Sequence, residues 1–579
     1  MASTCLAPAS LSTPLLSDSI ARAPAANGHA TNHRHHHHDD SDGAAAVSVC
    51  DDGGGDPFAF LSEDRPPRDR GPSPADPFRN GTPAWGGGVY AWSRTLLLLP
   101  VALVRLALFG LSIAIGYAAT WVALRGWADT HGRPRVGGGP MPAWRRRLMW
   151  ITRISARCIL FSFGYHWIRK KGRPARRELA PIVVSNHISY IEPIFFFYEL
   201  FPTIVSSESH DALPFVGTII RAMQVIYVDR FSPASRKAAV NEIKVKTVPL
   251  NMCCDHLVAF KNVALMSFQR KAACNSFPRV LLFPEGTTTN GRFLISFQHG
   301  AFIPGYPVQP VVVRYPHVHF DQSWGNISLL KLMFKMFTQF HNFMEVEYLP
   351  VVYPPEIKQE NALHFAEDTS YAMARALNVL PTSYSYGDSM IMARAIEAGK
   401  VNGSNYMVEM AWVKDIYGVS TAEAMDLLEH FLAMNPDNDG RVKAQDFWAH
   451  FGLDCSPLCK KIFHYFDLGI KESITFRQFL VGCAHLRKQP LFQGACETAF
   501  EKCRDPETSE ISRAQLADVL RLSMLLPSGD RMLDLFKTFD IDGDEKISKD
   551  DFMTCLGRFP FLIAFFAAPI NGEVYIEIV

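Results

Sequence analysis

The stretch PIVVSNHISYIEPIFFF, residues 181–197, sets the fold of the region around it. Its short apolar run 182–184 predicts a buried strand, and the residues from Ser189 onward predict a helix. His187 lies at the junction of the two, where both elements position it and it can face a cleft. The spacing Ser189-x-x-Glu192 also fits a helix capping box, however, so a purely structural interpretation of these residues stays open.

Short apolar runs alternate with helix-like stretches over residues 176–355, which is typical of an α/β domain. Two of these runs end in polar residues. QVIYVDR, residues 224–230, closes a predicted strand with an acid and a base. RVLLFPEGTTTNG, residues 279–291, is a predicted buried strand followed by a loop rich in glycine and threonine that carries a carboxylate. Such a loop suits a backbone that approaches a phosphate closely.

Four blocks in a fixed order make this region resemble the glycerolipid acyltransferase family. The blocks are NHISYIE from residue 186, the segment from Gly217 to Arg230, FPEGTTTNG from residue 283, and YPVQPV from residue 306. The family pattern has N-H-x-x-x-x-D, G-x-x-x-x-x-R, F-P-E-G-T and a V-P-V-type strand. The resemblance covers about residues 180–315 and implies an α/β acyltransferase domain.

The resemblance implies that His187 is a general base. It would take the proton of a glycerol hydroxyl as that oxygen attacks the thioester of acyl-CoA. The family's acid, which orients the imidazole and stabilises its cation, falls on Glu192. Glutamate replaces the family's aspartate there and adds one methylene, so the carboxylate must approach from a different angle. We interpret this departure as the mark of a subtype.

The resemblance also implies a site for the acceptor lipid. Glu285, Gly286 and Thr287 would hold its glycerol-phosphate region, and Arg230 would pair with the phosphate. The structural alternative for Arg230 is a salt bridge near Asp229.

The composition of the 579-residue chain indicates contact with membranes or a large apolar pocket. Hydrophobic residues make up 48%, including Phe 41, and the net charge of +1 favours no charged partner, so no nucleic acid is expected. The 12 cysteines are scattered, which indicates reduced thiols in the cytosol. Residues 1–90 are rich in Ala, Ser, Pro, Gly and Asp, and we predict a disordered low-complexity tail.

Residues 95–170 predict a transmembrane and interfacial segment. The run 96–124 is almost entirely apolar, but Pro100 and Arg105 interrupt it, so a tilted span and a re-entrant hairpin both stay open. Many arginines follow, which places that side in the cytosol by the positive-inside rule. Residues 148–168 predict an interfacial helix. Residues 325–344 are amphipathic and would line a lipid entry route or pack in the core.

Helical residues 393–556 carry four loops, which begin at residues 435, 467, 504 and 540. The loop 540–551 matches the calcium loop of an EF-hand, although Glu545 replaces the usual glycine and the last ligand is an aspartate. Its expected calcium ligands are Asp540, Asp542, Asp544, Lys546 through its backbone, and Asp551. Weaker ligands are expected at Asn435, Asp437, Asp439, Arg441 and Asp446. The other two loops lack most acids and are interpreted as structural partners.

The sequence thus predicts an α/β acyltransferase domain with an amino-terminal membrane segment, followed by an all-α EF-hand domain. Residues 557–579 form an apolar tail that would dock on the acyltransferase domain or touch the membrane. This combination resembles the lysophosphatidylcholine and lysophosphatidylethanolamine acyltransferases, most closely the plant lysophosphatidylethanolamine acyltransferases.

The resemblance implies an acyl-CoA-dependent lysophospholipid acyltransferase of phospholipid synthesis and remodelling, with calcium as cofactor. Its expected location is an endomembrane, of the endoplasmic reticulum or of the Golgi and endosomes, with both domains in the cytosol. The alternative is a catalytically inactive, calcium-responsive lipid-binding membrane protein, which only Glu192 favours.

Overall fold

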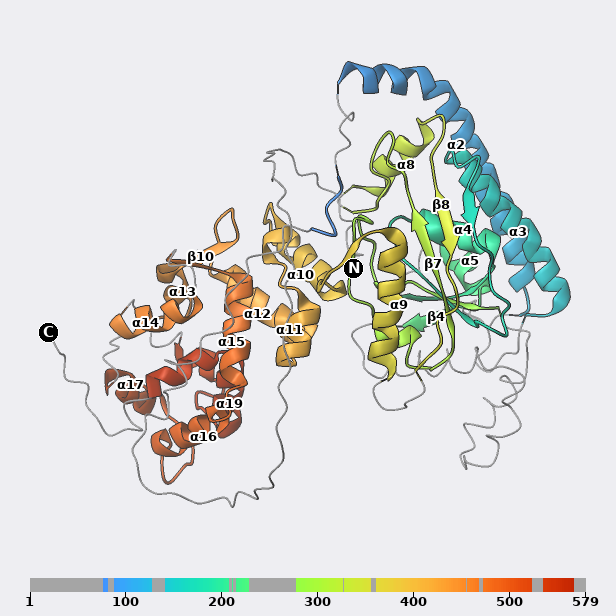
Figure 1. Ribbon diagram of the computed structural model, residues 1–579. Coiled ribbons are helices and arrows are strands. Elements are labelled where there is room, and N and C mark those ends of the chain that lie inside the picture. Colours follow the sequence, from blue (N-terminus) through green and yellow to red (C-terminus); the bar gives the residue numbers. More distant parts are fainter. Residues whose placement is uncertain are drawn as a thin grey trace, which may run out of the picture.

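The computed structural model contains a sheet-containing region and a helical carboxy-terminal region (Figure 1). It describes residues 76–81, 88–127, 141–207, 211, 215–228, 278–325, 327–355, 361–453, 456–467, 472–522 and 535–566. Arg230, expected to bind phosphate, lies outside these ranges.

Seven strands of the described residues form one sheet, with the order β1-β8-β7-β2-β5-β3-β4. Neighbouring strands run parallel except β7 and β8, which are antiparallel. The predicted strand at 182–184 is confirmed and is the central strand β2. The strands are β1 (Arg169–Lys171), β2 (Ile182–Ser185), β3 (Thr203–Ser207), β4 (Ile226–Val228), β5 (Val280–Leu282), β7 (Val308–Arg314) and β8 (Glu345–Tyr348).

Helices cover both faces of this sheet, so its central strands are buried throughout and apolar on both sides. Side chains of β2 alternate between the faces. Ile182 and Val184 share a core cluster with Phe365 of α9 (Asn361–Leu377). Val183 belongs to the opposite cluster, with Phe195 of α4 (Ile191–Glu199) and residues of α8 (Leu329–Phe337).

The long apolar run lies in a single helix, α2 (Val89–Leu124), which continues through Pro100. The part of this helix from Trp92 to Leu124 is long and apolar enough to cross a membrane. Helix α3 (Ala143–Ser162) packs against α2, where the hydroxyls of Thr120 and Thr152 lie 3.0 Å apart. The predicted interfacial helix at 148–168 therefore begins and ends earlier than expected.

Arg105, the charged residue that interrupts the apolar run, is hydrogen-bonded to the end of α8 and the loop that follows it. Its guanidinium donates to the backbone carbonyls of Phe337 at 3.1 Å, of Phe340 at 2.7 Å, and of Gln339. One face of α2 thus packs on the sheet-containing region. Its other face exposes apolar side chains, among them Leu97 (77%) and Val104 (71%). Figure 1 shows α2 running along the outer side of this region.

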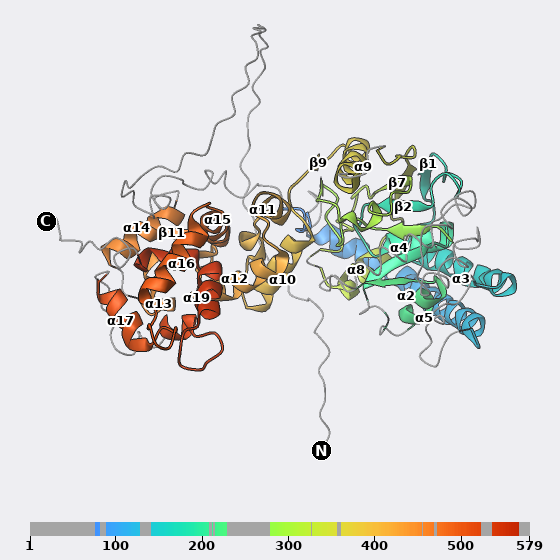
Figure 2. The same cartoon turned by 90° about the horizontal axis from the view of Figure 1, so that it is seen from below.

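Short elements connect the two regions. Helix α10 lies between them in both views (Figures 1 and 2). The two-residue strand β6 pairs with β9, just before α10. The connecting elements are β9 (Leu380–Pro381), α10 (Tyr386–Glu397), η4 (Gly403–Tyr406) and α11 (Met410–Tyr417). The short elements α5 (Val216–Ala222), β6 (Phe293–Leu294) and η3 (His299–Ala301) belong to the sheet-containing region.

Four helix–loop–helix units make up the carboxy-terminal region and lie in two pairs. In the first pair, β10 (Arg441–Lys443) is antiparallel to β11 (Ser473–Thr475) and joins Val442 to Ile474. In the second pair, Ile511 bridges to Ile547. The helices are α12 (Thr421–Ala433), α13 (Ala444–His450), α14 (Pro457–Phe466), α15 (Phe476–Arg487), α16 (Phe492–Cys503), α17 (Arg513–Leu522), residues 535–539, and α19 (Lys549–Arg558).

The apolar tail enters the carboxy-terminal core. Its described part, η5 (Pro560–Phe566), is buried. The ring of Phe561 lies 5.4 Å from that of Phe447 in the first pair, and the ring of Phe566 lies 5.0 Å from that of Phe552 in the second. For residues 560–566, the expectation that the tail docks on the acyltransferase domain or touches the membrane is therefore wrong, because the two pairs bury these residues among their aromatic side chains.

A short piece of the amino-terminal tail is also packed. Residues 76–81 fall within the predicted disordered range, yet Phe78 is only 3% exposed and shares a core cluster with Ile295, Tyr384 and Met407. The composition of residues 1–90 predicts that they lack the apolar surface for a core of their own. It could not show that one phenylalanine enters a core formed elsewhere.

Candidate active site

The predicted site residues gather where parallel strands end. His187 follows β2 and Glu285 follows β5, and these two strands are parallel neighbours. The carboxyl ends of parallel strands lie at the same edge of a sheet, which is where α/β proteins bind their ligands. The fold therefore brings together two loops that are about 100 residues apart in the chain.

His187 and Glu192 form a buried pair. The imidazole Nδ1 lies 3.1 Å from Oε2 of Glu192, whose side chain is fully buried, while that of His187 is 18% exposed. The ring of Phe283 stacks on the imidazole at 4.2 Å. Since a carboxylate only accepts hydrogen bonds, Nδ1 carries the proton. Nε2 is then the nitrogen that can take a proton from a substrate.

Glu192 also holds the turn before α4. Its carboxylate accepts the backbone N–H of Ser189 at 2.9 and 3.0 Å and that of Ile188 at 3.3 Å. The capping box is only half formed, because α4 has Tyr190 at its N-cap and no side-chain cap bond. One carboxylate therefore contacts both the imidazole and the backbone of the turn, as the two predicted roles require.

Tyr315 is a member of the site that the sequence motifs did not reveal. Its phenol is buried after β7, and burial, with the nearby charge of Glu192, raises the pKa of Tyr315 well above its usual value. A second buried phenol, Tyr165, donates to Oε1 of Gln322 at 2.6 Å. The position of Tyr315, directly after a predicted strand at the site edge, is the one signal that could have indicated it.

Glu285 faces the protein interior. Its fully buried carboxyl accepts the backbone N–H of His187 at 2.9 Å, and burial raises the pKa of Glu285 to about 8. Gly286, at φ +77°, takes the left-handed backbone that glycine adopts without strain. Thr287 is half-buried beside it. Glu285 thus fixes the loop from behind, while the residues that follow it are partly accessible.

Two loops lie on either side of His187. The backbone N–H of Thr289 donates to the carbonyl of His187 at 2.8 Å. Trp324, in the loop after β7, donates its N–H to the carbonyl of Ile188 at 2.8 Å, and its own carbonyl accepts from Thr288 Oγ1 at 2.7 Å. These bonds fix the backbone on which the imidazole is mounted.

In the carboxy-terminal region, the described residues hold one group of three acidic side chains that fits a metal ion. The carboxylates of Asp540, Asp542 and Asp544 lie within 4.8 Å of one another. Glu545 has φ +66°, as expected from its place at the usual glycine position. Asp551 is bonded instead to Ser548. The oxygen donors present fit calcium, which prefers carboxylate and carbonyl ligands.

The first loop, 435–446, has a similar backbone turn. Its described residues do not form an acid group comparable to that of Asp540, Asp542 and Asp544. Oδ1 of Asp437 accepts the backbone N–H groups of Asp439 and Arg441, at 3.0 and 2.8 Å. Gly440 takes the left-handed conformation at φ +73°. The loop therefore has the turn that a calcium loop needs but a poorer set of ligands.

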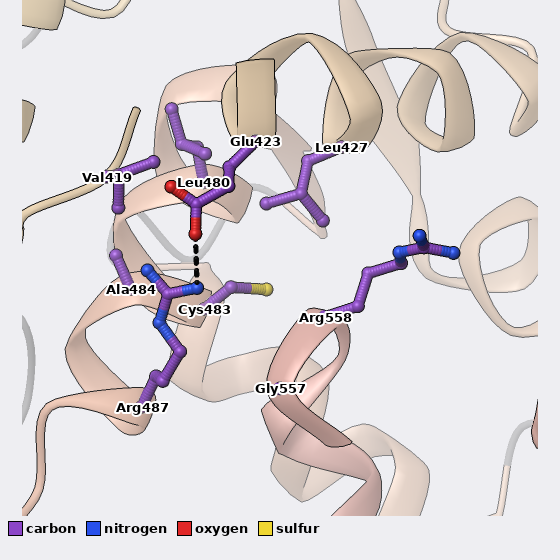
Figure 3. A pocket seen from close by; sticks show the side chains of 9 residues that line it. All are labelled: Val419, Glu423, Leu427, Leu480, Cys483, Ala484, Arg487, Gly557 and Arg558. Carbon is purple, nitrogen blue, oxygen red and sulfur yellow. Dashed lines mark hydrogen bonds and ion pairs between the residues drawn. The ribbon is translucent and has the colours of Figure 1, made fainter. Parts of the chain in front are cut away.

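A small hollow lies far from His187, between α12, α15 and α19 (Figure 3). Leu427 and Cys483 line it, and Glu423 and Arg487 form an ion pair across its edge at 3.0 Å. Burial raises the pKa of the Cys483 thiol, which keeps it protonated. The hollow is a packing feature where the first pair meets the last helix, and no site residue points into it.

The chain is similar to several known acyltransferases. The Acyltransferase family model matches residues 168–314. The chain is 55% identical to the lysophospholipid acyltransferase LPEAT2 of Arabidopsis thaliana over 88% of both chains. It is 30% identical to lysophosphatidylcholine acyltransferase 2 of Mus musculus, over 67% of this chain and 68% of that one. It is also 28% identical to lysophosphatidylcholine acyltransferase 1 of Rattus norvegicus, over 80% and 82%. The chain belongs to the lysophospholipid acyltransferase family.

Proposed function

We propose that His187 and Glu192 catalyse the transfer of an acyl chain from acyl-CoA to the free hydroxyl of a lysophospholipid. Nε2 of His187 takes the hydroxyl proton as the oxygen attacks the thioester carbonyl. The carbon–sulfur bond then breaks, and the imidazolium returns the proton to the CoA thiolate. Glu192 stabilises the imidazolium through Nδ1. The observation that carries this proposal is the 3.1 Å contact between His187 and the buried carboxylate of Glu192.

For the acceptor, we propose that its phosphate lies over the loop 285–291. Gly286 lets the backbone approach, Thr287 supplies a hydroxyl, and Glu285 keeps the loop in place from behind. Arg230 follows β4, whose carboxyl end belongs to the same sheet edge, and is proposed as the phosphate's charge partner. As the headgroup we propose ethanolamine first, since the lysophospholipid acyltransferase at 55% identity is LPEAT2.

The test is an acylation assay on the full chain in detergent–lipid micelles. The substrates are acyl-CoA and a panel of lysophospholipids with ethanolamine, choline and other headgroups. His187→Ala should lower kcat by at least about a hundredfold, because it removes the general base. His364→Ala, at an exposed histidine on α9, is the control. Equal rates for wild type and His187→Ala would overturn the proposed role of His187.

The inactive lipid-binding alternative has lost its support. Glu192 was the residue that favoured it, and Glu192 contacts the imidazole as the family's acid would. Its extra methylene lets the carboxylate reach the backbone of Ser189 at the same time.

We propose that α2 anchors the protein in an endomembrane, with both regions in the cytosol. The exposed apolar face of α2 supports the membrane contact. Contacts hold α2 along its length, from Arg94, which lies 3.0 Å from His319, to the bond between Thr120 and Thr152 of α3. A helix held in this way fits an anchor lying along the membrane. If α2 lies along the membrane, maleimide should label cysteines introduced at both ends of α2 from the same side of sealed vesicles. Labelling from opposite sides would indicate a span.

We further propose that the four carboxy-terminal loops are EF-hands and that loop 540–551 binds calcium. The pairing of Val442 with Ile474 and of Ile511 with Ile547, at the eighth position of each loop, supports this proposal. Asp540, Asp542, Asp544, the carbonyl of Lys546 and Asp551 are the proposed ligands. A weaker site is proposed at Asn435, Asp437, Asp439, Arg441 and Asp446. Calorimetric titration of Asp540→Ala should show loss of the stronger site, and unchanged calcium binding would overturn the assignment.

A further inference from the structure

Residues 76–81, which we call the strap, cross the surface beside the active site. Phe78 anchors the strap, because it is 3% exposed and packs in a core cluster with Ile295 and Met407. Asp76 stiffens it by accepting the backbone N–H groups of Phe78 at 2.9 Å and Arg79 at 3.1 Å. The strap therefore has both a buried anchor and a fixed local shape.

The strap holds the glycine- and threonine-rich loop. The side-chain amide of Asn290, itself 3% exposed, donates to the carbonyls of Asp76 at 2.7 Å and Arg79 at 3.0 Å. The backbone N–H of Asn290 donates to the carbonyl of Pro77 at 2.7 Å. The adjacent Thr289 bonds to the carbonyl of His187. Three hydrogen bonds thus connect the strap to Asn290, and the neighbouring Thr289 contacts His187, the proposed catalytic histidine.

The strap also holds the second loop beside His187. The side-chain amide of Asn80 donates to the carbonyl of Ser323 at 2.7 Å, and the N–H of Gly81 donates to Oδ2 of Asp321 at 2.5 Å. The next residue, Trp324, donates to the carbonyl of Ile188. The same six residues therefore fix both loops that flank the imidazole.

The elements that connect the two regions contact the strap in turn. Ser404 of η4 donates its hydroxyl to Oδ2 of Asp76 at 2.5 Å. Gly440 of loop 435–446 packs directly on η4, since a Cβ at Gly440 would lie 3.0 Å from the Cβ of Asn405. A continuous series of contacts therefore runs from loop 435–446 through η4 and the strap to the loop at Thr289.

We propose that the strap positions the active site, and that η4 holds the strap for this purpose. Its residues act through Asn290 and Ser323, so they are positioning residues rather than catalytic ones. Small displacements of catalytic groups lower the chemical step strongly, even when substrates still bind. Releasing the strap should therefore lower kcat more than it raises the KM for acyl-CoA. This inference rests on the proposed roles of His187 and the loop 285–291.

The first test is Asn290→Asp in the full chain, assayed with acyl-CoA and lysophosphatidylethanolamine. Aspartate keeps the size of the side chain but loses both N–H groups that bind the strap. We expect kcat to fall about tenfold with the KM for acyl-CoA unchanged, in assays run well below the melting temperature of the variant. Asn402→Asp, at an exposed position beside η4, is the control and should retain wild-type kcat.

The second test separates positioning from folding. Phe78→Ala should lower kcat, and Phe78→Leu, which keeps an apolar anchor, should restore most of it. Ser404→Ala should lower kcat about threefold, because it removes the hydrogen bond between η4 and Asp76 of the strap. Ser389→Ala is its control, since Ser389 bonds only within α10.

The proposal is overturned if Asn290→Asp and Phe78→Ala both keep kcat within about twofold of wild type, or if Phe78→Leu loses as much as Phe78→Ala. It is also overturned if the loss of activity follows the loss of thermal stability. An inactive wild type in the same assay would instead refute the proposed function. The two failures are therefore distinguishable.

Discussion

The same four-residue pattern, serine followed three residues later by an acid, occurs in the catalytic region and in the last loop. Ser548 and Asp551 form a complete capping box, in which each residue bonds to the backbone of the other. Ser189 and Glu192 form only half of one, and the carboxylate of Glu192 bonds to His187 as well. One motif is thus a helix cap, and in the other the acid also contacts the proposed catalytic histidine.

Side-chain length separates the two cases. Glu192 is one methylene longer than the family's aspartate, and it reaches both the backbone of Ser189 and the imidazole. Asp551 is one methylene shorter than the usual glutamate of a calcium loop. It stays bonded to the hydroxyl of Ser548 at 2.6 Å, outside the acid group of Asp540, Asp542 and Asp544. We therefore expect the function of an acid three residues after a serine to depend on whether its carboxylate reaches a partner beyond the helix cap.

Glu192→Gln should have the largest effect. Glutamine keeps the length and the hydrogen bond to Ser189 but loses the charge that stabilises the imidazolium. We expect kcat to fall by about a hundredfold or more, with little change in melting temperature. Steady-state acylation kinetics measure the effect. The control is Glu199→Gln at the end of α4, where the pair with Lys170 is exposed. A Glu192→Gln variant with wild-type kcat would mean that Glu192 is only a cap.

Glu192→Asp tests the role of length directly. Aspartate restores the residue of the family pattern but is too short to serve both partners in this backbone. We expect about a tenfold loss of kcat, because the carboxylate stays with the cap and leaves Nδ1. Nitrogen-15 NMR of the imidazole should show the lost contact. Full activity of Glu192→Asp would show that the backbone moves to keep the pair.

Glu285 is a second buried acid of the site, and its carboxyl accepts the backbone N–H of His187. Because the pKa of Glu285 is raised to about 8 from an ordinary value of 4.5, the folded chain holds a proton that the unfolded chain has lost between these pH values. The ionisation of Glu285 therefore lowers the free energy of unfolding as pH rises through this window. Glu285→Gln should weaken this trend.

Melting temperatures at about pH 6 and about pH 9 bracket the upper part of this window and measure the trend. The control is Glu367→Gln, at a side chain that is 51% exposed on α9. If Glu285→Gln and wild type lose stability equally between the two pH values, Glu285 does not ionise in this range.

The sequence predicted the residues of the site better than the contacts that support them. His187 and Glu285 were found because each follows an apolar run of strand type. The two strands are parallel neighbours in the sheet, so the residues that follow them lie at the same edge. The anchoring role of Phe78 could not be found in this way, because it depends on contacts between distant segments and follows no local pattern. Tyr315 does follow a strand, β7, but its closeness to Glu192 depends on the folded structure. The burial of Glu285 was missed for the same reason, since the motif gives its position but not the direction of its side chain.

Asp551→Glu should have the smallest effect on the enzyme and tests the other half of the comparison. The added methylene lets the carboxylate extend beyond Ser548 toward Asp540, Asp542 and Asp544, as the twelfth residue of a calcium loop does. We expect calcium affinity to rise about tenfold, by about 1.4 kcal/mol, in calorimetric titrations, while kcat at saturating calcium stays unchanged. Asp550→Glu, at the exposed neighbour on α19, is the control. Equal affinity in Asp551→Glu and wild type would show that Ser548, and not side-chain length, keeps this acid away from the ion.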